Sequence, residues 1–207
     1  MFNSNFFIAA AVAAFGTADA RYRFFDYTPV DKYTSTNPYG TNPNTGKIID
    51  DMTAYGAFVG AYDEKTGQMK DFENLHFASG AFGKLYYVNL LADKYGKLKD
   101  TGKVYEIKDK DGNVKDTANA VLKIMDVAEL AEQNLSASAN PMDEAKKLIL
   151  NEFEVNQKLS ALANPHPNIA QAFGMRLSPI DTSNRDAQTA LLVLEICHGH
   201  ELEDIIA

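Results

Sequence analysis

The chain has 207 residues, of which 45% are hydrophobic and 23% are charged, and its formal net charge is −8. This length predicts one sizeable core with an extension and leaves little room for two compact domains. The acidic balance argues against binding to nucleic acid or to an anionic membrane surface. The single cysteine excludes an internal disulfide, and the four scattered histidines give no zinc-ligand spacing.

Residues 1–20, MFNSNFFIAAAVAAFGTADA, resemble a signal peptide. An apolar run from Phe6 to Gly16 is too short to span a bilayer, and Ala18 and Ala20 are small residues at the positions that a signal peptidase reads. These features favour cleavage and a place in the secretory pathway or outside the cell. The n-region lacks Lys and Arg, so a buried N-terminal helix in a cytoplasmic protein and an artefactual start remain alternatives.

Residues 21–70 are rich in Tyr, Asn, Thr, Pro and Gly, and their apolar positions show no sustained period. This pattern predicts an extended, poorly ordered N-terminal extension. One hairpin is expected within it, turning at residues 65–67.

From Phe72 onward the pattern alternates between strands and helices. A strand-like stretch over 72–91 is followed by a polar excursion and by two strand-like runs that meet at Asp111-Gly112, a strong hairpin signal. The clearest helix is 143–162, with Asp143 as its expected N-cap. Two further strands, NIAQAFGMRL and ALLVLEI, precede the start of a second helix in ELEDIIA.

One charged residue interrupts the apolar face of the helix, and another interrupts a strand. Glu152 falls within the apolar face of the helix, and Lys123 interrupts the strand AVLKIM. Buried charges are costly unless they are paired, so we expect an ion pair. The alternative is that Glu152 lies in water at the edge of its face. We expect the pair to be shielded by the part of this face around Leu148, Val155 and Leu159. The whole face consists of Ala145, Leu148, Ile149, Val155, Leu159 and Leu162.

The stretch FASGAFGKLYYV, residues 77–88, has two interpretations. It is either a small-residue turn between two strands or a loop whose backbone N–H groups lie against a phosphate. A paired lysine on the next strand favours the second, because both elements would then face the same anion.

Taken together, these stretches resemble the N-terminal lobe of a eukaryotic-type protein kinase over residues 72–207. The glycine-loop pattern corresponds to residues 78–85, the strand lysine to Lys123 and the helix glutamate to Glu152. NPHPNIAQAFG is similar to the turn after that helix, and LLVLEICHGHELEDII to the fifth strand, the hinge and the next helix. A rival register for the glycine loop, TGKVY at 101–105, has lysines where glycines belong.

The resemblance implies an α+β fold: a kinase-like N-lobe of about five antiparallel strands and one long helix, with a disordered N-terminal extension. The lobe would span 71–194, followed by the hinge and the start of the next helix at 195–207. Lys123 and Glu152 would act in catalysis. The ATP-binding residues would be Phe77, Ala78, Ser79, Gly80, Ala81, Phe82, Gly83, Leu85, Val121, Lys123, Leu194, Glu195, Cys197 and Glu201.

Within that set, the resemblance makes Leu194 the gatekeeper, Glu195 and Cys197 the backbone contacts of adenine, and Glu201 a ribose ligand. Two departures are Ala78 in place of the first glycine and the long spacing between Gly83 and Lys123, which implies an insertion.

The sequence contains no His-Arg-Asp, Asp-Phe-Gly or Ala-Pro-Glu motif. We therefore expect no phosphate transfer by this chain alone, and magnesium binding only with the missing C-lobe. A longer form is expected to phosphorylate protein hydroxyls, on Ser or Thr rather than Tyr. The alternative is a non-catalytic, pseudokinase-like module that docks on a protein partner and that is secreted if residues 1–20 are a cleaved signal peptide. No transmembrane helix is predicted.

Overall fold

The computed structural model describes residues 24–31, 54–63, 66, 68–93, 95–135, 137–179 and 188–197. The helical elements are the 3-10 turn η2 (Phe72–Asn74), α2 (Val127–Leu135) and α3 (Pro141–Ser160). The strands are β1 Phe24–Pro29, β2 Ala54–Phe58, β3 Tyr62–Asp63, β4 Gln68–Met69, β5 Ala78–Gly80, β6 Gly83–Leu91, β7 Tyr105–Lys108, β8 Val114–Ala118, β9 Ala120–Asp126, β10 Ala172–Pro179 and β11 Gln188–Leu194.

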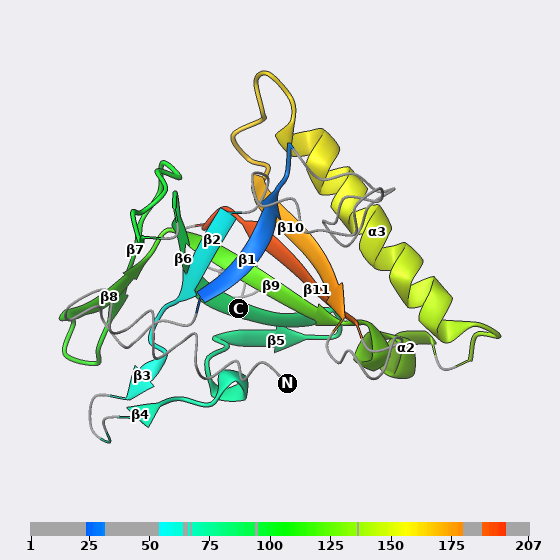
Figure 1. The fold of residues 1–207 in the computed structure, drawn as a ribbon, viewed down its shortest axis with the longest axis horizontal. Coiled ribbons are helices and arrows are strands. Elements are labelled where there is room, and N and C mark those ends of the chain that lie inside the picture. The colour runs from blue at the N-terminus through cyan, green and yellow to red at the C-terminus, as the bar shows by residue number, and fades with distance from the viewer. Residues whose placement is uncertain are drawn as a thin grey trace, which may run out of the picture.

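Six strands form a closed antiparallel barrel in the order β2-β1-β10-β11-β9-β6 (Figure 1). Pairing of β2 with β6, from Tyr55 opposite Leu91 to Phe58 opposite Val88, closes the ring. The additional strand β5 pairs with the start of β6, on the edge that β2 occupies further along. Hairpins β3–β4 and β7–β8 form separate two-stranded sheets.

The expected α+β lobe, with an open sheet of about five strands and a disordered extension, is therefore wrong. The segment predicted to be poorly ordered supplies β1 and β2, which join β10 to β6 and remove the open edges of the sheet. Both strands are short and lie in polar sequence, so periodicity did not reveal them. Their aromatic residues Phe25, Tyr27 and Phe58 pack into the barrel interior, and this burial is what holds the strands in place.

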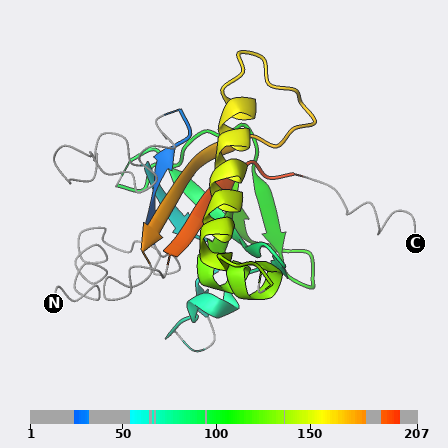
Figure 2. The same cartoon turned by 90° about the vertical axis from the view of Figure 1, so that its right-hand side faces the viewer.

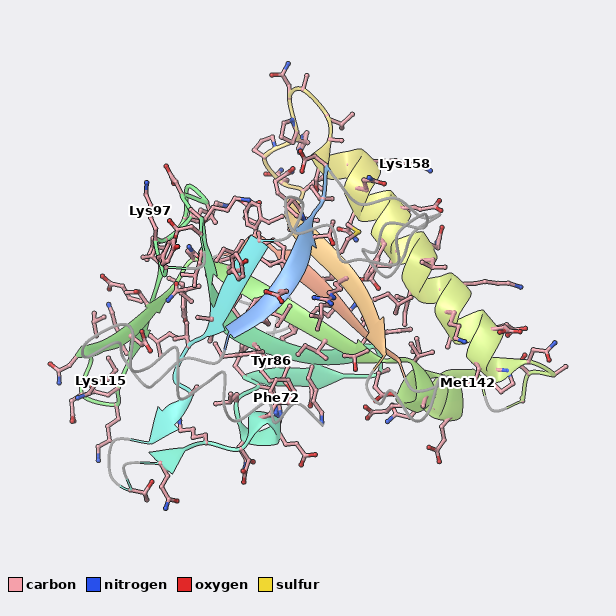
Figure 3. The ribbon with its side chains drawn as sticks, in the orientation of Figure 1. Phe72, Tyr86, Lys97, Lys115, Met142 and Lys158 are labelled. Atoms are coloured by element: carbon pink, nitrogen blue, oxygen red, sulfur yellow. The ribbon has the colours of Figure 1, made fainter. Side chains whose placement is uncertain are left out.

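The barrel interior is filled by aromatic and aliphatic side chains. Figure 3 labels Phe72 and Tyr86, whose rings stack with their centroids 4.9 Å apart. The buried members of this interior cluster are Tyr27, Phe58, Ala61, Tyr86, Val88, Leu90, Ala120, Leu122 and Val193.

A second core lies outside the barrel, where α2 and α3 cover the outer face of β9, β10 and β11. Figure 2 shows α3 running along this side of the sheet. Ile149 and Phe153 of α3 pack there against Met175 and Leu192. The helix was predicted over 143–162. It runs from Pro141 to Ser160 with Asn140 as its N-cap, so it ends two residues earlier than predicted and Asp143 lies in the first turn.

Both predicted hairpins are confirmed. Strands β3 and β4 pair on either side of residues 64–67, and β7 and β8 pair around Asp111-Gly112. The predicted signal peptide at 1–20 lies outside the described residues, as do residues 198–207 with the predicted start of a second helix.

The buried hydroxyl of Tyr27 is a destabilising feature of the interior, and a single substitution tests it. Its hydroxyl is fully buried without a hydrogen-bond partner among the described residues, and burial raises the pKa of this phenol above its ordinary value of 10.0. Since an unpartnered buried hydroxyl is unfavourable, we expect Tyr27→Phe to raise the free energy of unfolding by about 1 kcal/mol at pH 7. Urea denaturation of the full chain measures this change.

The same substitution should alter the pH dependence of stability. The unfolded chain ionises Tyr27 from about pH 10 upward, while the folded chain keeps it protonated, so this group's stability contribution is lost as the pH rises above 10. The advantage of Tyr27→Phe should therefore grow with alkaline pH, whereas the exposed control Tyr95→Phe should follow the parent chain. A less stable Tyr27→Phe protein would mean that the hydroxyl has a favourable contact.

Candidate functional site

Three neighbouring strands, β6, β9 and β11, bring several predicted site residues to one outer face of the barrel. Side chains two positions apart share a face, and Leu122, between Val121 and Lys123, points into the interior. The site residues form two cross-strand rows: Leu85, Lys123 and Leu192 in the first, and Tyr87, Val121 and Leu194 in the second.

Lys123 and Glu152 form the predicted ion pair. The Nζ atom of Lys123 donates a hydrogen bond to Oε1 of Glu152 over 2.8 Å, linking β9 to α3. The side chains are 19% and 32% exposed, so water still reaches the pair and its net contribution to stability is modest. The ammonium group is thus held at a defined position while remaining accessible from outside.

The expected shield around this ion pair is wrong. Leu148 and Val155 are each 45% exposed. Two members of the predicted apolar face, Ala145 and Ile149, are buried, and the third buried residue of α3 is Phe153, which was not part of that face. A helical apolar stripe is wide enough that periodicity alone does not tell which of its sides meets the sheet. The packing of α3 on β10 and β11 places Leu148 and Val155 in solvent.

The glycine stretch forms a tight β-hairpin. Gly80 pairs with Gly83 across a two-residue turn at Ala81-Phe82. Gly83 has φ +125°, and a Cβ at this position would overlap the carbonyl oxygen of Ile124, so only glycine fits. No neighbouring atom lies within 4 Å of the Cβ position at Gly80, so there is open space on that side of the hairpin.

The segment that follows β11, residues 195–197, is anchored through Glu195. Its backbone N–H donates to the carbonyl of Gln171, and its carboxylate accepts from Gln171 N–H and pairs with Nζ of Lys103 at 2.7 Å. Burial alone would raise the pKa of Glu195, but these hydrogen bonds outweigh it and hold the pKa below its ordinary value. Ile196 is buried and Cys197 is exposed.

Sequence reasoning missed an aromatic stack beside the site. The ring of Tyr87 lies between those of Phe77 and Tyr105, with centroid separations of 4.0 and 5.1 Å and nearly parallel planes. Burial, followed by a hydrogen bond with Tyr105, raises the pKa of Tyr87 to about 12. The paired tyrosines in KLYYV were the available signal, since one of two consecutive strand residues must face outward.

Three further observations concern the expected ribose ligand, the surface hollows and metal binding. Glu201, the expected ribose ligand, lies outside the described residues. Two surface hollows, of about 390 Å³ beside Leu148 and about 370 Å³ beside Asn89, are lined by neither Lys123 nor Glu152. Within the described part of the chain, no three His, Cys, Asp or Glu side chains gather as a metal-binding group.

No protein-family model and no curated protein sequence matches this chain. Among the residues that the structure describes, no helix has both the length and the apolar character needed to cross a membrane.

Proposed function

We propose that this chain binds ATP through the outer face formed by β5, β6, β9 and β11. The observation that carries the proposal is the Lys123–Glu152 ion pair, which holds an ammonium group at 2.8 Å from a helix carboxylate beside a glycine hairpin. A lysine held in this way can pair with phosphate oxygens, because its position is set before the ligand arrives.

The remaining contacts divide between the two ends of the nucleotide. Lys123 and the backbone at Gly80 would meet the phosphates, and the aliphatic side chains of Leu85, Val121 and Leu194 would contact the base. Among the residues that the structure describes, the carbonyl of Glu195 and the backbone of Cys197 take part in no hydrogen bond, which supports their role at the base edge. An adenine ring suits such a largely apolar surface with a few polar groups at its rim.

The proposed role in chemistry is that of the ATP-binding part of a protein phosphotransferase acting on Ser or Thr. Lys123 and Glu152 would orient the phosphates for transfer in a longer form of the protein. Transfer also needs an aspartate for the acceptor hydroxyl and ligands for magnesium, and the sequence lacks the motifs that supply them. For the chain itself the proposal is therefore ATP binding.

A second candidate is a non-catalytic module that binds a protein partner. The exposed Leu148 and Val155 on α3 favour it, because exposed apolar side chains beside a surface hollow are typical of docking surfaces. Retention of ATP affinity without dependence on Lys123, or no ATP affinity, would favour this candidate.

Calorimetric titration of the full chain with ATP tests the proposal. We expect Lys123→Ala to weaken ATP binding by about tenfold or more, since a hydrogen bond between charged groups contributes about 1.5–3 kcal/mol. Lys158→Ala is the matched control: Lys158 also pairs with a glutamate of α3, Glu154, but is exposed near the end of the helix (Figure 3). Equal ATP affinity in Lys123→Ala and the parent chain would refute the phosphate role.

A further inference from the structure

The β7–β8 hairpin and the residues that lead into it lie against the base end of the proposed site. Tyr105 and Ile107 of β7 pack in one cluster with Tyr87 and Val121, which belong to the second row of the site. The buried members of that cluster are Val59, Ala118 and Ile196. The hairpin therefore contacts both the strand face and the segment 195–197.

Polar contacts attach the same element at a second point. Lys103, two residues before β7, reaches Glu195 over 2.7 Å. The hydroxyl of Thr101 donates to the carbonyl of Asn119, which ties the lead-in to the start of β9. Glu195 is in turn bonded to Gln171 through both its backbone and its side chain. The position of 195–197 thus depends on Lys103 as well as on β10.

The aromatic stack connects the hairpin to Phe77, on the other side of the site. Tyr105 stacks on Tyr87 with an interplanar angle of 13°, and Tyr87 stacks on Phe77 with an angle of 15°. Phe77 is 44% exposed, so the stack ends in a ring that water reaches. A planar base is the kind of group that extends a parallel stack of rings.

We infer that the β7–β8 hairpin positions the base end of the nucleotide site, with Lys103 and Tyr105 as its positioning residues. The inference rests on the proposed ATP binding and adds that different residues serve the base and the phosphates. The hairpin sets the arrangement of Phe77 and of residues 195–197 that accepts the base, while the phosphates depend on Lys123. The ion pair of Lys103 with Glu195 and that of Lys123 with Glu152 share no residue.

The test compares ATP with inorganic tripolyphosphate, which offers the phosphates without a base, by calorimetry on the full chain. Lys103→Met keeps an unbranched side chain only one atom shorter and removes the charge. We expect it to weaken ATP binding by about fivefold and to leave tripolyphosphate binding within about twofold of the parent chain. Lys123→Ala should weaken both ligands. Lys115→Ala, at another exposed ion pair of the hairpin, is the control and should change neither.

Amide hydrogen exchange provides a readout that needs no ligand. In Lys103→Met the Glu195 amide, whose N–H donates to the carbonyl of Gln171, should exchange faster, because the side-chain anchor of this residue to Lys103 is lost. Unchanged exchange there, or unchanged ATP affinity in Lys103→Met, overturns the positioning role. Equal weakening of ATP and tripolyphosphate overturns it too, since it indicates a general structural loss.

The two proposals fail in different ways. Suppose that both ligands bind, that Lys123→Ala weakens both, and that Lys103→Met leaves the ATP affinity unchanged. The hairpin inference is then wrong and the ATP proposal stands. If Lys123→Ala changes neither ligand, or the parent chain binds neither, the ATP proposal is wrong, and with it the inference that rests on it.

Discussion

Replacing Phe153 with alanine is expected to lower the free energy of unfolding by about 3–5 kcal/mol. Phe153 is fully buried on α3, in the cluster that joins both helices to β10 and β11. Truncation removes most of a large apolar side chain and leaves a cavity that the surrounding sheet cannot close. Urea denaturation of the full chain, followed by circular dichroism, measures the loss.

The control for this substitution is Phe82→Ala in the turn between β5 and β6. Phe82 is mostly exposed, so its truncation should change stability by no more than about 0.5 kcal/mol. A Phe153→Ala protein as stable as Phe82→Ala would show that α3 is not held on the barrel through this face. The Lys123–Glu152 pair would then lose its structural basis, since α3 carries Glu152.

Gly174→Ala should strongly destabilise the barrel. Gly174 lies on β10, and a Cβ there would overlap the ring of Tyr27 and crowd the carbonyl oxygen of Thr28, both on β1. Tyr27 is fully buried and has no free space into which to move. We expect a loss of about 3 kcal/mol, at the upper end for overpacked cores, measured by the same denaturation experiment.

A double-mutant cycle identifies the cause of that loss. In a Tyr27→Val background the side chain lacks the Cδ2 and Cε2 atoms that an added Cβ would overlap, so Gly174→Ala should destabilise less, with a coupling of about 1–3 kcal/mol. Gly80→Ala is the matched strand control, because nothing lies near its Cβ position, and it should be nearly neutral. Additive effects of Tyr27→Val and Gly174→Ala would contradict the close approach of β1 to β10.

Several features of the site could be predicted because their signals are local. The Asp111-Gly112 turn and the helix α3 follow from residues adjacent in sequence. The pairing of Lys123 with Glu152 also followed, because an isolated charge on each of two apolar elements needs a partner. Residues 77–88, for which a turn between two strands and a phosphate loop were the two interpretations, form a strand, a turn and a strand.

The closed barrel was not predictable in the same way. Phe24–Pro29 pairs with a strand that begins more than a hundred residues later, and a pattern of six residues cannot specify a partner at that separation. Polar sequence around β1 and β2 suggested disorder, yet Phe25, Tyr27 and Phe58 gain enough burial in the interior to order both strands.

The sequence by itself determined which residues form the helix α3, the hairpins and the charged pair, since backbone preferences and apolar spacing act over a few residues. Only the tertiary structure decided that the sheet closes, that Leu148 and Val155 face solvent, and that Tyr105 stacks beside Val121. These outcomes depend on which surfaces meet. Apolar surface becomes buried only when the whole set of elements is assembled, and no single segment specifies that assembly.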